Sequence, residues 1–289
     1  MHERLKGSVG VIAGPHPAEP RSLRLSEIRR QCAVTMLDLY KRANAGHIGT
    51  SLSCLEILVD LCFHRMKGDD ALVLSKGHAA AALYTTLSLS GRLPEADLSS
   101  FYQEGTLLAA HPPCSGKIRA IPFGTGSLGH GLGLACGLAL SQRFTGKRWR
   151  VFAVLSDGDC NEGSTWEAVL FAAHHKLSSL TVVIDLNCIQ GIGHTKDILS
   201  MEPIVDKWRA FGFAVSIADD GNDFGSLARA YDSVQRSSGP RCIIARTVKG
   251  HGVSYMANRV EWHYLPMRDE QYAQALSELG SADDGPAYH

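Results

Sequence analysis

Two polar side chains, each placed at the end of an apolar run, could together hold a metal ion. Asp157 directly follows VFAVLS at 151–156, and Asn187 ends LTVVIDLN at 180–187. They are roughly 30 positions apart, the length of one strand–helix–strand unit. Mg²⁺ often takes one or two carboxylates plus phosphate oxygens, so this pair suits Mg²⁺ carried by a diphosphate. The alternative is that both residues only stabilise turns, because Asp-Gly is a common turn pair.

The elements that would position these residues follow from the hydrophobic pattern. Short, continuous apolar runs predict strands at 71–75, 151–156, 180–187, 213–219 and 241–247. Helical periodicity covers 23–43, and Ser51 or Ser53 is expected to cap a second helix running to about Met66. This alternation predicts an α/β fold, a parallel sheet with helices on both faces.

Ligands of such sheets bind at the carboxyl ends of the strands. The loops expected at those ends are 75–78, 156–163, 187–194 and 247–252. All four are therefore candidates for the functional site.

Composition excludes several classes of function. The chain has 289 residues, of which 45% are hydrophobic and 20% charged, which argues against disorder. Lys+Arg and Asp+Glu both number 29, so no basic excess indicates a nucleic-acid partner. No apolar stretch reaches the ~20 residues of a membrane span, and the N-terminus lacks the apolar core of a secretory signal. The eight cysteines form no CxxC pair and are predicted to be reduced, in a cytoplasmic protein.

Further motifs occur in a fixed order along the chain. They are AGHIGTSLS at 45–53, LSKGHAAAALY at 74–84, AHPP at 110–113, GTGSLGHGLGLACGLAL at 124–140, SDGDCNEG at 156–163 and EWH at 261–263. Together they resemble the N-terminal half of a transketolase, over roughly residues 25–265. The length and the style of the motifs are similar to the N-terminal subunit of transketolases that are encoded as two chains.

The resemblance implies a thiamine diphosphate-binding domain of the PP type, with thiamine diphosphate and Mg²⁺ (or Ca²⁺ or Mn²⁺ substituting) as cofactors. We expect a mobile arm at 1–22, the cofactor-binding domain at 23–265 and a C-terminal tail at 266–289. The tail, small and polar, is expected to be a natural terminus.

The same resemblance assigns the cofactor contacts. Asp157, Asn187 and the backbone carbonyl of Ile189 correspond to the Mg²⁺ ligands. Gly158, without a Cβ, lets the backbone approach the phosphate. The Gly-rich turn beside the cofactor is formed by Gly126, Ser127 and Leu128, and the helix after it points its N-terminus at the anion.

Four of the 13 histidines fall in the matching motifs: His47, His78, His111 and His263. In the family these positions line the channel to the cofactor and assist proton transfers, work that suits a neutral imidazole near pH 7. His174, His175 and His194 are interpreted as structural.

Glu162 and Glu167 have two interpretations. The resemblance places both at the subunit interface, near the partner's cofactor-activating glutamate. Alternatively, Glu162 is an acid favoured by the start of a helix and Glu167 a surface residue.

Three positions depart from the family pattern. Ser156 replaces the first Gly of GDG, His130 replaces a Gln, and Gly191 stands where an apolar residue is usual. Ser156 is small, so we expect its turn to survive, whereas Gly191 leaves packing near the cofactor unexplained.

The expected function is the diphosphate- and Mg²⁺-binding half of a transketolase. With a C-terminal subunit, most simply as an α₂β₂ heterotetramer, it would transfer a two-carbon ketol unit between sugar phosphates. The alternatives are a component of another thiamine diphosphate enzyme (the α chain of a 2-oxo-acid dehydrogenase or a deoxyxylulose-phosphate synthase-like protein) or a non-catalytic cofactor-binding module.

Overall fold

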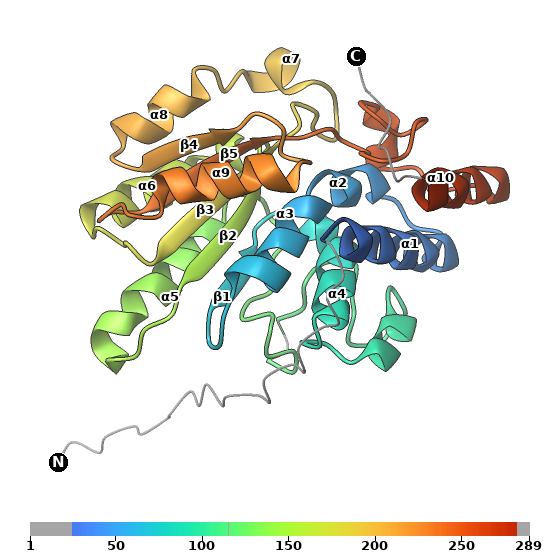
Figure 1. Cartoon of the computed structure of the whole chain (residues 1–289), viewed down its shortest axis with the longest axis horizontal. Helices are drawn as coiled ribbons and strands as arrows, with labels where there is room; N and C mark the ends of the chain where they lie inside the picture. Colours follow the sequence, from blue (N-terminus) through green and yellow to red (C-terminus); the bar gives the residue numbers. More distant parts are fainter. Residues whose placement is uncertain (1–24, 115, 282–289) are drawn as a thin grey trace.

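Five parallel strands form the centre of the chain (Figure 1). This computed structural model describes residues 25–114 and 116–281. The strands are β1 (Ala71–Leu74), β2 (Val151–Ser156), β3 (Leu180–Leu186), β4 (Ala214–Ala218) and β5 (Arg241–Arg246). Their order across the sheet is β1-β2-β3-β5-β4, and all four pairings are parallel. The α/β prediction is confirmed, and each predicted strand agrees with the structure to within one residue at either end.

Helices cover both faces of the sheet. The α-helices of the described residues are α1 (Leu25–Ala43), α2 (Ile48–Ser53), α3 (Leu55–Asp60), α4 (Ala80–Leu89), α5 (Gly131–Thr145), α6 (Gly163–His174), α7 (Thr195–Leu199), α8 (Ile204–Ala210), α9 (Phe224–Val234) and α10 (Asp269–Ser281). Alternate residues of one strand enter different cores: Phe152 and Val154 pack with the layer of α1, α3, α4 and α9, and Ala153 and Leu155 with that of α5, α6 and α8. Burial on both faces explains why the strands are continuously apolar.

The helix before β1 differs from the prediction. It begins at Ile48 and breaks at Cys54, so the expected caps Ser51 and Ser53 instead lie inside α2, fully buried. Their hydroxyls serve tertiary contacts, because Ser51 Oγ is 2.6 Å from Tyr40 Oη and Ser53 Oγ donates to Asp185. Beyond α3, a π-helical turn at Leu61–Arg65 ends the segment near the predicted Met66.

The C-terminal helix α10 lies beside α1 (Figure 1). Ala275 and Leu279 of α10 are buried, and Lys41 of α1 forms an ion pair with Asp269 at 2.5 Å. Residues 269–281 are thus packed against the domain, although the sequence predicts a tail for this segment. The expected arm at 1–22 and the end of the expected tail, 282–289, lie outside the described residues.

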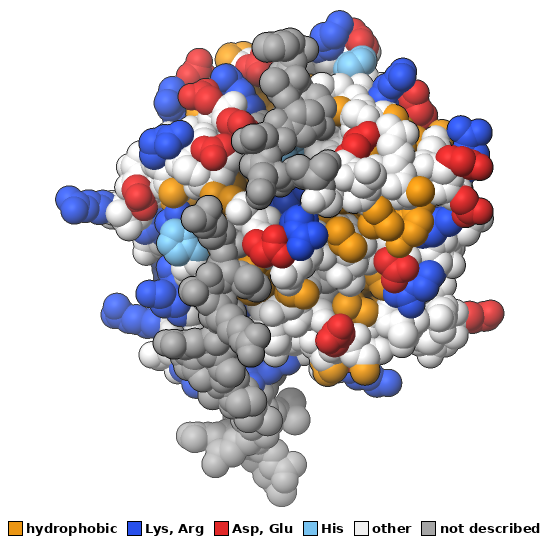
Figure 2. All heavy atoms as spheres, turned by 45° about the vertical axis from the view of Figure 1, so that its right-hand side comes forward, with side chains coloured by type: hydrophobic (Ala, Val, Ile, Leu, Met, Phe, Trp, Pro, Cys, Tyr) orange, Lys and Arg blue, Asp and Glu red, His pale blue; other side chains and the backbone are white. Residues whose placement is uncertain are grey.

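Surface and thiol chemistry agree with the composition. On the face shown in Figure 2, acidic and basic side chains are interspersed, as the zero net charge suggests. All eight cysteines are free thiols, as predicted. Among the helices that the structure describes, none has the length and apolar character needed to cross a bilayer.

Candidate functional site

The three residues expected to bind the metal come from adjacent strand ends. Ser156 of β2 is in register with Asp185 of β3, so the loops that begin with Asp157 and Asn187 leave the same edge of the sheet. Asp157 is 2% exposed and Asn187 7%. The backbone N–H of Ile189 donates to Asn187 Oδ1 at 3.0 Å, which folds the second loop back over Asn187.

The charges at this edge suit a cation that is bound together with an anion such as a phosphate group. Burial raises the pKa of Asp157, although Thr195 Oγ1 donates to its Oδ2 at 2.6 Å. Lys249 Nζ donates to the carbonyl of Ile189 at 3.2 Å, so a metal ion on that oxygen would lie beside an ammonium and would need the negative charge of phosphate groups. The described residues include no group of three or more His, Cys, Asp or Glu that could hold a metal alone. The donor set therefore fits Mg²⁺ that shares its shell with phosphate oxygens, as the family's cofactor would provide.

The four motif histidines form one cluster. The ring centroid of His47 lies 5.5 Å from that of His78, 6.2 Å from that of His111 and 5.1 Å from that of His263. Lys249 Nζ is 3.1 Å from His263 Nδ1 and 3.2 Å from the carbonyl oxygen of Ile189, so this lysine connects the cluster to the loop of the predicted ligand Ile189. The structure thus brings together four residues that are spread over more than 200 positions of the sequence.

Burial keeps these imidazoles neutral near pH 7. It is the main cause that lowers the pKa of His47 to about 4, with contributions from His111 and Lys249. It also lowers the pKa of His263 to about 3, with Lys249 second, and lowers the pKa values of His78 and His111. A neutral imidazole can donate and accept a proton, which the expected chemistry requires.

Local backbone contacts fix the positions of two histidines. His47 has a φ of 72°, and its N–H donates to the carbonyl of His263 at 3.0 Å. His78 follows Gly77, where a Cβ would lie only 2.6 Å from the carbonyl oxygen of Thr125. Glycine at 77 therefore lets the His78 segment pack directly on the Gly-rich loop.

The Gly-rich turn packs against the loop after β2. Gly126, Ser127 and Leu128 precede the 15-residue helix α5, and Leu128 Cδ1 lies 3.0 Å from where a Cβ on Gly158 would be. The N–H of Gly129 donates to Asp159 Oδ1 at 2.8 Å. The structure thus brings the predicted cofactor-binding residues Gly126, Leu128 and Gly158 to one place.

Asp159 organises these loops, and the sequence did not single it out. It is fully buried and accepts hydrogen bonds from Ser75 Oγ, the N–H of Gly129, and both the N–H and Oγ of Ser156. Ser156, one of the three departures, keeps the turn intact as expected and adds a hydroxyl donor to Asp159. The sequence feature that could have pointed to Asp159 is the second aspartate of SDGDC, directly after the Asp-Gly pair.

Two buried lysines were also missed. Lys76 forms a fully buried ion pair with Asp185, and Lys249 is equally inaccessible. Burial, followed by the charge of Lys76, lowers the pKa of Lys249 to about 8. Both lie in Lys-Gly-His triplets, at 76–78 and 249–251, and this repetition was a usable signal.

The other two departures have different outcomes. A Cβ on Gly191 would lie 2.4 Å from Tyr264 Oη and 3.2 Å from His263 Nε2, so Tyr264 fills the space of the usual apolar side chain. His130 is exposed before α5 and makes no side-chain cap there. Nothing in the structure explains His130.

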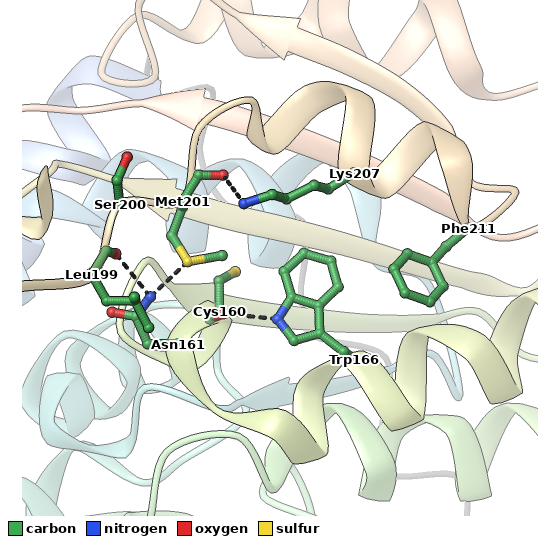
Figure 3. Close-up of a pocket in the computed structure, with 8 residues that line it drawn as sticks. All are labelled: Cys160, Asn161, Trp166, Leu199, Ser200, Met201, Lys207 and Phe211. Carbon is green, nitrogen blue, oxygen red and sulfur yellow. Dashed lines mark hydrogen bonds between the residues drawn. The ribbon is translucent and has the colours of Figure 1, made fainter.

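Glu162 and Glu167 are both exposed at the start of α6. Nearby, a cavity of about 290 Å³ is lined by Cys160, Asn161, Trp166, Leu199, Ser200, Met201, Lys207 and Phe211 (Figure 3). Asn161 Oδ1 accepts from Gln190 Nε2 at 2.6 Å, which connects this cavity to the loop that contains Ile189. The cavity itself includes none of the predicted site residues.

Fold and site together define a parallel α/β domain in which a histidine cluster lies beside the sheet edge that carries the predicted metal ligands. The family described as transketolase, thiamine diphosphate binding domain, matches residues 25–287, and the chain belongs to this family. It is 36% identical over 273 residues to one of the named subunits of the apulose-4-phosphate transketolase of Actinobacillus succinogenes, covering 90% of this chain and 98% of that protein. It is also 36% identical over 248 residues to a 6-deoxy-6-sulfo-D-fructose transketolase subunit of Clostridium sp., covering 82% and 90% of the two chains.

Solved structures of full transketolases share the fold. The transketolase of Campylobacter jejuni superposes with a TM-score of 0.81 at 30% identity, covering 89% of this chain but 42% of that one. The chain thus spans nearly all of the relative from Actinobacillus succinogenes and less than half of the solved enzyme. The predicted cofactors, thiamine diphosphate and a divalent metal, are those of the family.

The histidine cluster can be tested by substitution. We expect His78→Ala, and His47→Asn (asparagine tolerates the positive φ), to reduce turnover of the assembled enzyme by about 10²-fold or more. The melting temperature should change little, because each variant replaces a neutral, partly exposed ring. Turnover per folded molecule and thermal unfolding are measured together. Normal turnover with a large loss of stability would show that these histidines serve the core instead.

Proposed function

We propose that this chain, with a C-terminal partner subunit, is a transketolase that transfers a two-carbon ketol unit between sugar phosphates. The observation that carries the proposal is the cluster of four histidines, with pKa values lowered by burial, beside the sheet edge of Asp157 and Asn187. The relatives of matching length are named as transketolase subunits, which supports a two-chain enzyme.

In this proposal, Asp157, Asn187 and the carbonyl of Ile189 hold Mg²⁺. Gly158 and the turn Gly126–Leu128 contact the cofactor. Thiamine diphosphate, when bound, would supply a carbon nucleophile for the donor ketose. His47, His78, His111 and His263 hydrogen-bond the sugar hydroxyls and accept or return their protons, because neutral imidazoles can do both.

Lys249 would neutralise part of the diphosphate charge. Its ammonium lies 3.2 Å from the carbonyl of Ile189 and 3.1 Å from His263 Nδ1, between the metal-binding loop and the histidines. Its lowered pKa reflects burial beside Lys76, and an anion placed there would stabilise the charged form.

The partner subunit would cover the exposed start of α6, with Glu162 and Glu167 near its activating glutamate. The simplest assembly is an α₂β₂ heterotetramer with two active sites. The eight free thiols support a cytoplasmic location. A binding module without catalysis would have no use for the four clustered histidines, which favours the enzyme.

The lowered pKa of Lys249 predicts that cofactor affinity depends on pH. Because its pKa in the cofactor-free chain is about 8, binding above that pH must take up a proton. The affinity for thiamine diphosphate with Mg²⁺ should therefore be constant below about pH 7.5 and fall above pH 8, at up to tenfold per pH unit. Calorimetric titrations across this range measure it.

Lys249→Arg is the matched control, because arginine stays protonated throughout. This variant should bind with an affinity that does not change over the same pH range. A wild-type affinity that is independent of pH up to about 9.5 would contradict the placement of Lys249 at the diphosphate.

The experiment that tests the proposed function begins with co-purification of the companion chain. The pair is then assayed with thiamine diphosphate, Mg²⁺ and a panel of ketose phosphate donors and aldose phosphate acceptors. Ketol transfer that requires both chains supports the proposal, and a pair that binds cofactor yet transfers nothing to any acceptor overturns it.

A further inference from the structure

Asn187 ends in an amide that could face a metal ion with its oxygen or its nitrogen, and only the oxygen can be a ligand. We propose that Ser53 and Asp185 are positioning residues that fix the Asn187 amide with its oxygen available to the metal. The inference rests on the metal ligands of the proposed function, and it names the residues that orient one of them.

Asp185 is the starting point of the orientation. It is fully buried near the end of β3, and the ammonium of Lys76 contacts its Oδ2. Its Oδ1 accepts from Ser53 Oγ at 2.7 Å and from Thr247 Oγ1. In all three of these contacts the neighbouring group donates and Asp185 accepts.

The hydroxyl of Ser53 lies between Asp185 and the amide of Asn187. Its single hydrogen points at Asp185, so only its lone pairs are left for other neighbours. The amide of Asn187 lies 3.0 Å from Ser53 Oγ, and the group that faces a lone pair must be its NH₂. The Asn187 oxygen is thereby turned to the opposite side.

A second contact, at the oxygen end of the Asn187 amide, favours the same orientation. The backbone N–H of Ile189 can only donate, and it lies 3.0 Å from Asn187 Oδ1. An acceptor at one end and a donor at the other leave one orientation of the amide that satisfies both. This orientation puts Asn187 Oδ1 beside the loop whose carbonyl, at Ile189, is the next proposed ligand.

The chain also contains a matched control for the hydrogen bonds from Asp185 through Ser53 to Asn187. Thr247 donates to the same oxygen of Asp185 and lies 3.1 Å from Ser53 Oγ, but none of its hydrogen bonds in the described structure reaches Asn187. Thr247→Val and Ser53→Ala each remove one hydroxyl from Asp185. Only Ser53→Ala removes the acceptor that orients the amide.

The test is a titration of the chain, assembled with its partner subunit, with Mn²⁺ at saturating thiamine diphosphate, in which electron paramagnetic resonance counts free Mn²⁺. Ser53→Ala should raise the Mn²⁺ dissociation constant about tenfold, as loss of a residue that orients a ligand typically does. Thr247→Val should change it less than about twofold. Thermal unfolding confirms that both variants are folded.

A double variant separates orientation from general damage. In an Asn187→Asp background both ends of the side chain are oxygen, so adding Ser53→Ala should have little further effect on Mn²⁺ binding. Equal effects of Ser53→Ala and Thr247→Val, or an undiminished effect of Ser53→Ala in this background, would overturn the inference. If Asn187→Ala itself binds Mn²⁺ normally, the proposed metal ligand is wrong and the proposed function falls with it.

Discussion

The purified chain, given thiamine diphosphate, Mg²⁺ and sugar phosphates, will show no ketol transfer until a C-terminal partner subunit is added. In the resembled family, a glutamate from the other half hydrogen-bonds the cofactor's aminopyrimidine ring and activates it. The subunit-length relatives, of which one is covered to 98%, support an enzyme made of two chains. Because positioning and acid–base assistance by the partner are both lost, the expected effect is several orders of magnitude in rate.

A coupled assay of aldose and ketose phosphates measures this prediction. The control is the same preparation after addition of the partner, which shows that the chain was folded and competent. Robust transfer by the chain alone, with contaminating full-length transketolase excluded by mass spectrometry, would contradict it. The activating acid would then have to be sought within these 289 residues.

Asp157→Ala should weaken the binding of thiamine diphosphate with Mg²⁺ at least tenfold, equivalent to about 1.4 kcal/mol or more. Asp157 is the only acid among the three proposed ligands, so its loss removes the only negative charge that they offer the metal. Burial raises the pKa of Asp157, and a bound cation would stabilise its charged form. The fold should tolerate the change, because the variant no longer buries a charge there.

Calorimetric titration of the assembled protein measures the affinity. Asp219→Ala is the matched control, since Asp219 is an exposed acid whose side chain is 83% accessible. It should bind the cofactor as the wild type does. Unchanged affinity in Asp157→Ala would eliminate Asp157 as a metal ligand.

The strands were predictable because their residues face an apolar layer on both sides. Runs such as VFAVLS are continuously apolar, so they can be assigned as strands without an alternating pattern. The bounds of β2 match the prediction at both ends. The short helix α2 was predicted less well, since its serines resemble helix caps locally. Only tertiary partners, Tyr40 for Ser51 and Asp185 for Ser53, show why these hydroxyls lie inside the helix.

Site residues that lie in sequence motifs were predictable, and residues whose role comes from buried contacts were not. The loops of Asp157 and Asn187 followed from strand ends, whereas the histidine assignments depended on resemblance to a family. Lys76 and Asp185 are 109 positions apart, and nothing in either local sequence shows that they form a buried pair. The partners of such residues become visible only when the sheet brings β1 and β3 into one layer.

The most direct test of the central claim, that this chain is the Mg²⁺- and diphosphate-binding half of a two-chain transketolase, is a titration with the partner subunit. At a fixed concentration of this chain, we predict that tightly bound thiamine diphosphate and ketol-transfer rate rise together and saturate at one partner per chain. The cofactor should in turn tighten the assembly, because it binds the assembled state preferentially. Tight cofactor binding and full activity that do not depend on the amount of partner would contradict the claim.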